Sequence, residues 1–328
     1  MGLCSFDKLF SKNVPHIIEK IFLSLDYESF KNCVEVSHAW KDLLTSEAFQ
    51  KMVKSVFKKE ISKDQKKLWE AAEEGDVTEV RRLLSNKMLN VNKKQGSDCN
   101  TPLHRAAIKG HKVVVQLLLN SGADPNLASF GGSTPLHYAV RGSHRDVVKI
   151  LLEKGAEINK SISFTGTTSL HLAAAIGCIR VFQILVDKGA TLNKVDRLGE
   201  TPLHEAINND HAYVVQLLLN KGADSNGGYG QMWTPLHHAV ARGNIYLINL
   251  LLKRGADPNR QVKDGQTPLH TAVMNGNEEV VQMLLTKGAM PNKEDEQRIT
   301  PITIAHEIHR MDLVFILSKY TTGHYNPL

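Results

Sequence analysis

Histidine is the residue type with the most evident capacity for chemistry in this chain, because imidazole can ligate metal ions and exchange protons near neutral pH. Six of the fifteen histidines end a repeated tetrapeptide, as His104, His137, His171, His204, His237 and His270. A metal site needs ligands that converge on one point. Histidines at one helical phase of successive repeats would instead lie about 10 Å apart, the spacing of packed helices. The pattern therefore favours a structural role, with each ring bonded to neighbouring backbone or hydroxyl groups.

No other catalytic constellation emerges from the sequence. The chain has no phosphate-binding glycine loop, no convincing Ser/His/Asp or Cys/His set and no paired carboxylates with a definable pocket. Its four cysteines are far apart and form no CxxC pair: Cys4, Cys33, Cys99 and Cys178. That usage suits a reducing compartment, so we expect an intracellular protein, cytoplasmic or nuclear, without disulfides, zinc or a cofactor. We expect no enzyme activity of the chain itself.

The tetrapeptide is the start of a helix. Its first residue recurs every 33 or 34 positions, at Thr101, Thr134, Thr168, Thr201, Thr234, Thr267 and, in a degenerate copy, Thr300. A threonine before an apolar run is a good N-cap, and the proline that follows suits the first helical position. Leucine and small residues such as Ala106 and Ala107 complete a short helix that a neighbour can approach closely.

A second, strongly apolar helix follows in each unit, as in residues 113–119, and it ends at a glycine such as Gly122. Its apolar density predicts that neighbouring units cover it. Turn-forming residues such as Asp264 and Gly265 then predict a short hairpin-like finger before the next threonine. In one unit Asp210 replaces the glycine expected between the two helices.

This repeat length and the repeated Thr-Pro-Leu-His motif resemble the ankyrin repeat. The resemblance predicts an all-α solenoid of about eight helix-turn-helix units with β-hairpin fingers, over residues 66–320, followed by a tail at 321–328. An atypical first unit begins near Leu68, and the last runs from Thr300 to about Tyr320. Solenoids of this kind bind other molecules through their surfaces.

The segment 13–57 has a different pattern. Apolar residues at Ile17, Ile18, Ile21, Phe22 and Leu25 share one helical face, and a second amphipathic run follows from Phe30 to Trp40. The proline, the Ile-Phe helix, Leu-Asp, Val-Ser, Trp and Leu-Leu resemble an F-box, a small three-helix domain. Residues 1–12 would form a tail, and 58–65 a linker or helical junction.

The F-box resemblance implies docking onto a Skp-type adaptor, which links to a cullin–RING ubiquitin ligase. By position, the adaptor-facing residues would be Pro15, Ile18, Ile21, Phe22 and Leu25. The chain would then be the substrate-recruiting subunit of an SCF-type ligase. The alternative is a non-catalytic ankyrin scaffold or inhibitor whose N-terminal helices only cap the solenoid.

In an ankyrin stack, the resemblance places the target-binding surface on the fingers and on the exposed side of the first helices. The position after the tetrapeptide histidine varies between units: Arg105, Tyr138, Leu172, Glu205, His238 and Thr271. Tyr, Trp, Phe and Arg dominate binding hot spots. The predicted target-binding residues are therefore Phe130, Tyr138, Arg141, Phe164, Arg197, Tyr229, Met232, Trp233 and His238.

Composition limits the other classes of partner. The 328 residues carry a net charge of +6. Acidic residues interrupt or follow the lysines of residues 51–67, which favours a solvated helical face over a nucleic-acid site, so we expect no nucleic-acid partner. No apolar run reaches the length of a membrane span, so we expect no membrane insertion. The partner is expected to be a protein, whose identity the repeat surface does not encode.

Overall fold

The computed structural model describes residues 47–228 and 232–321, and within these ranges all regular secondary structure is helical. The adaptor-facing residues predicted from the F-box resemblance, Pro15 to Leu25, lie outside the described residues, as does Tyr229. The chain divides into two units, residues 1–68 with 86–90 and residues 69–85 with 91–328. Helix α5 (Glu47–Glu74) runs without a break through 58–65, so that segment is helical.

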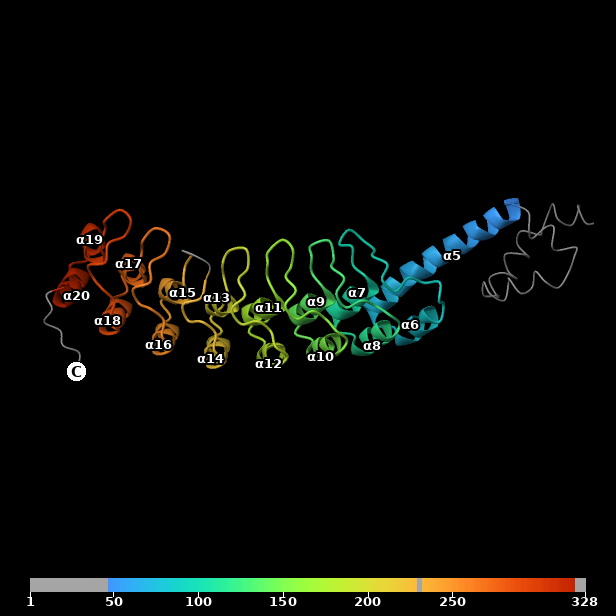
Figure 1. Cartoon of the computed structure of the whole chain (residues 1–328), viewed down its shortest axis with the longest axis horizontal. Helices are drawn as coiled ribbons and strands as arrows, with labels where there is room; N and C mark the ends of the chain where they lie inside the picture. Colours follow the sequence, from blue (N-terminus) through green and yellow to red (C-terminus); the bar gives the residue numbers. More distant parts are fainter. Residues whose placement is uncertain (1–46, 229–231, 322–328) are drawn as a thin grey trace, which may run out of the picture. The chain divides into compact units, whose positions relative to one another are not determined.

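Fifteen shorter helices follow α5 in the described residues, and they alternate between two rows (Figure 1). The first helices of the units are α7 (Pro102–Lys109), α9 (Pro135–Arg141), α11 (Ser169–Ile176), α13 (Pro202–Asn208), α15 (Pro235–Arg242), α17 (Pro268–Met274) and α19 (Pro301–Glu307). The second helices are α6 (Val77–Leu84), α8 (Lys112–Asn120), α10 (Arg145–Glu153), α12 (Ile179–Asp187), α14 (Ala212–Asn220), α16 (Ile245–Lys253), α18 (Glu278–Thr286) and α20 (Met311–Thr321). The predicted all-α class and the helix-turn-helix unit are confirmed.

Each first helix packs on the first helix of the next unit and on the second helix of its own. The small residues predicted to permit close approach are fully buried, including Ala106, Ala107, Ala173 and Ala206. The second helices bury their apolar side chains between neighbours, and Phe182 of α12 is the largest fully buried side chain described. The core is therefore a continuous layer between the two rows of helices rather than a single centre.

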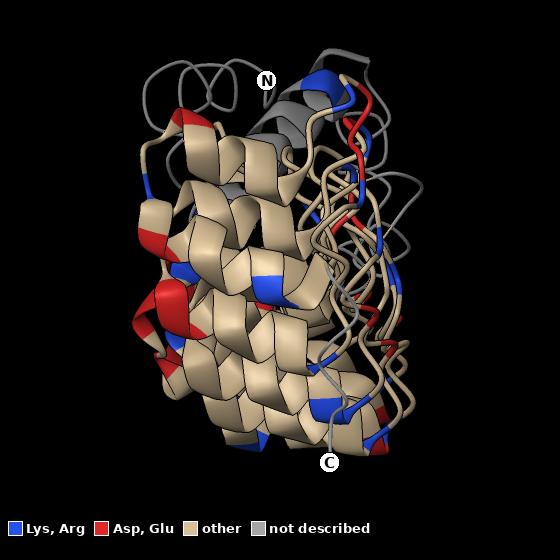
Figure 2. Ribbon diagram, turned by 90° about the vertical axis from the view of Figure 1, so that its left-hand side faces the viewer, with Lys and Arg blue, Asp and Glu red and all other residues tan. Residues whose placement is uncertain are grey.

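The fingers lie on one side of the stack, and the helices gather on the other (Figures 1 and 2). They are less regular than the predicted β-hairpins. Among the described residues they contain only two isolated bridges, Gln95 with Asn100 and Ser161 with Thr168. Other fingers close with a single backbone bond, as from Asp196 N–H to Glu200 O at 2.9 Å. One pairing per finger is too short a ladder to form strands.

Every tetrapeptide histidine is buried and bonded, as the sequence predicted. The Thr101 N–H donates to His104 Nδ1 at 3.1 Å, and His104 Nε2 donates to Ser133 O in the next finger at 3.2 Å. The other five rings repeat this pattern, with Nε2 at 3.0–3.3 Å from Lys160 O, Glu200 O, Trp233 O, Gln266 O and Ile299 O. Each ring thus joins a helix start to the neighbouring unit, and it must be neutral to do so.

The turn between the two helices of a unit contains a residue in the left-handed conformation, and in some units a histidine of the next unit leaves room there only for glycine. Gly177 has φ +73°, and a Cβ at this position would lie 2.5–2.7 Å from the His211 ring of the following unit. In two units the glycine is replaced and the residue corresponding to His211 is smaller, whereas Gly243 faces Asn277 of the next unit and remains a glycine. Ser143 (φ +56°) replaces the glycine where Cys178 of the next unit stands in the place of His211. Asp210 (φ +59°) replaces it where Asn244 stands there, and Asp210 accepts from Asn244 Nδ2 at 2.8 Å. The aspartate that departs from the pattern therefore has a matching partner.

Asparagines at the base of the fingers clamp adjacent units together. Asn226 Nδ2 donates to Gly255 O at 2.9 Å, and Asn226 Oδ1 accepts from Asp257 N–H at 2.8 Å. The same pair of bonds recurs at Asn92, Asn126 and Asn259. These bonds hold each finger at a fixed distance from the next.

We expect Asn226→Ala to lower the free energy of unfolding by about 1–2 kcal/mol, because it removes two inter-unit hydrogen bonds from a partly exposed site. Urea denaturation followed by circular dichroism measures the change. Asn292→Ala is the matched control, since Asn292 is exposed and lies one finger beyond the last of these clamps. Equal losses from the two variants would refute the clamp.

Candidate protein-binding surface

Exposed apolar side chains lie on four consecutive fingers. Phe130 is 72% exposed, Phe164 63%, Leu198 65% and Met232 49%. We call these four residues the apolar ridge. The rings of Phe130 and Phe164 lie 6.5 Å apart, so two fingers join their aromatic surfaces. Large apolar groups grouped in this way on a polar loop surface are typical of an interaction site.

Backbone hydrogen bonds tie neighbouring fingers together near these side chains. Phe130 N–H donates to Asp98 O at 2.8 Å, and Arg197 N–H donates to Thr165 O at 2.9 Å. A Cβ on Gly132 would clash with Ser163, which reflects the same close approach. The ridge is therefore presented by linked fingers rather than by independent loops.

The predicted residues Tyr138 and Arg141 both lie on α9, but their surroundings differ. Tyr138 is half-buried, with its hydroxyl donating to Ser129 Oγ at 3.3 Å and its ring edge-on to His104 at 5.8 Å. Arg141 is exposed in the last turn of the helix. The Tyr138 side chain is thus fixed by contacts beside the fingers, whereas the Arg141 side chain extends into solvent.

The predicted residues Trp233 and His238 lie next to each other. Trp233 is 39% exposed and meets the His238 ring edge-on at 5.4 Å. His238 Nδ1 lies 2.8 Å from Asn208 Oδ1. Burial, and secondarily the nearby Arg242, lower the pKa of His238 to about 4, so the ring is neutral at physiological pH.

Sequence reasoning missed an acidic cluster next to this group. Glu200 Oε1 lies 3.5 Å from His238 Nε2, too long for a strong hydrogen bond to a ring that is itself uncharged. Burial, followed by Asp196, raises the pKa of Glu200. Burial also raises the pKa of Glu205, with further contributions from Glu200 and Asp196. We call Asp196, Glu200 and Glu205 the acidic cluster.

Two signals in the sequence point to these missed residues. Glu205 occupies the variable position after the tetrapeptide histidine, and Leu198 lies next to the predicted Arg197 on the same finger. Arg197 is exposed too. The Asp196 side chain accepts the backbone N–H groups of Leu198 and Glu200, which turns the finger so that Leu198 projects outward.

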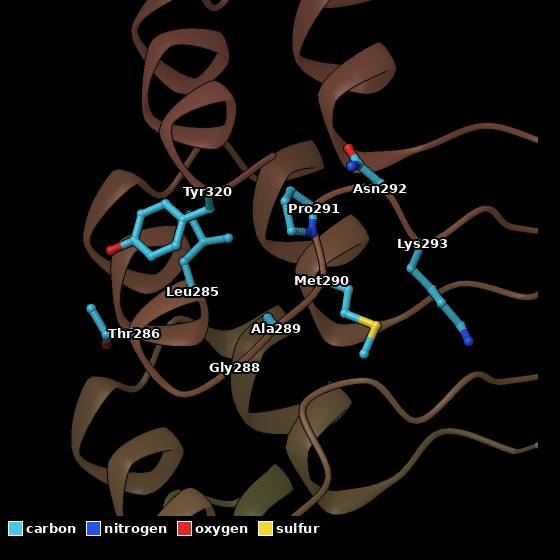
Figure 3. Close-up of a pocket in the computed structure, with 9 residues that line it drawn as sticks. All are labelled: Leu285, Thr286, Gly288, Ala289, Met290, Pro291, Asn292, Lys293 and Tyr320. Carbon is cyan, nitrogen blue, oxygen red and sulfur yellow. The ribbon is translucent and has the colours of Figure 1, made fainter. Parts of the chain in front are cut away.

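A cavity of about 520 Å³ lies away from this surface, where the loop after α18 passes below Tyr320 of α20 (Figure 3). Leu285 faces the Tyr320 ring in this view, and Met290, Pro291 and Lys293 follow along the loop. The lining contains no carboxylate, histidine or cysteine. It therefore offers neither the acid–base pair nor the metal ligands that a catalytic pocket usually provides.

Within residues 47–228 and 232–321, no group of three or more His, Cys, Asp or Glu side chains could hold a metal ion. Over the same ranges, no helix has the length and apolar content needed to cross a membrane. What the described geometry can do is bind, through linked fingers that carry apolar and acidic groups.

Comparison with known proteins agrees with this architecture. A family model described as ankyrin repeats (3 copies) matches residues 68–162, 158–229 and 225–295. The crystal structure of the human ASB11 ankyrin repeat domain is 30% identical with a TM-score of 0.58, over 67% of this chain and 96% of that one. The ankyrin repeat domain of Bcl-3, a member of the IkappaB protein family, is 31% identical with a TM-score of 0.61, over 67% of this chain and 100% of its own.

Curated relatives match over shorter segments. Human ankyrin repeat domain-containing protein 49 is 50% identical over 68 residues, which are 20% of this chain and 28% of that protein. The probable E3 ubiquitin-protein ligase XBOS33 of Oryza sativa subsp. japonica is 41% identical over 66 residues, 20% of this chain and 13% of its own length. The matched segments thus span less than a third of either relative.

The fold and the surface define a class of repeat protein that interacts with other proteins through stacked helix pairs and their fingers. The chain belongs to the ankyrin-repeat family.

Proposed function

We propose that this protein is the substrate-recruiting subunit of an SCF-type cullin–RING ubiquitin ligase. The observation that carries the proposal is the F-box-like pattern of residues 13–57 placed before an ankyrin array. The pattern would engage a Skp-type adaptor, and the fingers would hold a target protein. Similarity to a probable E3 ubiquitin-protein ligase over one segment is consistent with this role.

The mechanism is proximity. Holding a target beside the ubiquitin-charged enzyme raises the effective concentration of its lysines, so transfer becomes effectively intramolecular. The chain makes and breaks no bond in this scheme, in keeping with the repeat fold and with the composition of the described cavity. The proposed target-binding residues remain Phe130, Tyr138, Arg141, Phe164, Arg197, Tyr229, Met232, Trp233 and His238.

Co-expression with a Skp-type adaptor and size-exclusion chromatography test the proposal. We expect a stoichiometric complex that Ile18→Asp with Phe22→Asp abolishes, because two buried charges in the docking face would have no partner. Phe130→Ser is the control and should leave the complex intact, since it changes a finger. A folded chain that forms no complex would leave the scaffold or inhibitor function as the better answer.

A further inference from the structure

The apolar ridge and the acidic cluster lie on neighbouring fingers, and together they specify the chemistry of a partner. Leu198 belongs to both regions, because its finger runs from Asp196 to Glu200 and its side chain is 65% exposed. On the next finger, Met232 and Trp233 are 49% and 39% exposed. Gly228 of that finger approaches Gly199 O, with an added Cβ only 3.8 Å away. The acidic cluster is therefore flanked by apolar side chains on both sides.

The cluster has no cation of its own in the described structure. Among the described ion pairs of Asp196, Glu200 and Glu205, the one partner is His238, which burial keeps neutral at physiological pH. Burial and then Asp196 raise the pKa of Glu200, and burial, Glu200 and Asp196 raise that of Glu205, so a positive charge brought from outside would stabilise these two carboxylates. Charge complementarity of this kind gives specificity to an interface.

We propose that the target binds through a segment that lays apolar side chains along Phe130, Phe164 and Leu198 and inserts a lysine or arginine between the Leu198 and Trp233 fingers. The stem of that side chain would lie against Leu198 and the face of Trp233, where a cation is favoured, and its charge would meet Glu200 and Glu205. This assignment rests on the proposed use of the fingers to hold a target. Beyond that role, it specifies the type of peptide segment that the fingers would select.

The ridge also sets the length of the segment. Three intervals between fingers, at about 10 Å each, span about 30 Å. An extended chain covers that distance in about nine residues. A random 16-residue peptide library displayed on phage is therefore long enough to probe the surface with the full-length protein immobilised.

We expect enriched peptides to combine apolar residues with at least one lysine or arginine. Individual peptides, measured by fluorescence anisotropy, should bind at least tenfold more weakly to Phe164→Ser with Leu198→Ser. They should also bind at least tenfold more weakly to the Glu200→Gln, Glu205→Gln double variant. Peptides whose basic residue has been replaced should bind this double variant and the unmodified protein equally well. Phe164 and Leu198 are exposed, and glutamine keeps the size of the half-buried Glu200 and Glu205, so the fold should be retained.

Two matched controls should leave binding unchanged. Tyr246→Ser removes a similarly exposed ring, 54% exposed, from the second helix α16. Glu278→Gln with Glu279→Gln removes two carboxylates from α18. Absence of any enriched peptide, enrichment of acidic peptides, or equal loss with the control pairs would overturn the assignment. The adaptor complex depends on residues 13–57, so its presence or absence is scored independently.

Discussion

Lowering the pH from 7 to 5 is expected to unfold the repeat array. Burial lowers the pKa of His104, His137 and His237 to about 4 and that of His204 to about 3, while an unfolded histidine titrates near 6.5. The unfolded chain therefore binds more protons than the folded one between these values. Stability from these rings is complete above pH 6.5 and is lost as the pH falls toward 4.

The expected size is large because the effect repeats in every unit. Each such histidine lowers the free energy of unfolding by about 1.4 kcal/mol per pH unit, and four of them by about 5 kcal/mol. Total stabilities are about 5–15 kcal/mol, so the array should lose its fold near pH 5. Glu200 and Glu205, whose pKa values are raised, act in the opposite direction and offset a small part.

Urea denaturation at a series of pH values measures this slope directly. His237→Gln should weaken the protein at pH 7.5 yet reduce the slope by about 1.4 kcal/mol per pH unit, because one titrating ring is gone. A free energy of unfolding that stays flat from pH 7 to pH 5 would contradict the assignment of neutral, bonded rings.

Gly177→Ser is expected to destabilise the protein by about 3 kcal/mol. The left-handed backbone costs a non-glycine residue about 1–2 kcal/mol, and overpacking against the His211 ring adds about 1–3 kcal/mol. Gly189→Ser is the control, with φ +87° and no atom within 4 Å of an added Cβ, so only the backbone cost applies.

The chain itself supplies the rescue for this variant. In the repeat register Ser143 corresponds to Gly177 and Cys178 to His211, so Gly177→Ser with His211→Cys copies a pair that the protein already contains. The double variant should recover part of the loss, even though it gives up the bond from His211 Nε2 to Ala175 O. Thermal denaturation that places the double variant below Gly177→Ser would exclude the proposed contact.

The helical frame could be predicted from the sequence because each unit repeats the same local instructions. Thr101 and its equivalents cap helices, and the residues after them are small, apolar and evenly spaced. The histidines could be assigned to structure for the same reason, since identical phase excludes convergence on one point. Because the same sequence pattern recurs in each unit, each repeat supports the same structural prediction.

The surface was harder to predict because it depends on contacts between units. The sequence singled out Arg197 on its finger, but the Asx turn at Asp196 projects Leu198 as well. Glu200 and Glu205 interact across the turn that begins α13, a pairing that repeat spacing does not reveal. Asp210 departs from the repeated pattern, and the residue that matches it, Asn244, belongs to the next unit.

The bonds between finger tips have a consequence for how this protein can acquire new targets. They join backbone atoms, Phe130 N–H to Asp98 O and Arg197 N–H to Thr165 O, and therefore do not depend on the identity of the side chains that project there. Under the proposed use of the fingers, substitutions at Phe130, Phe164 or Leu198 would change what is recognised while the scaffold keeps its geometry. Mutation and selection can thus explore partners one finger at a time, at little risk to folding.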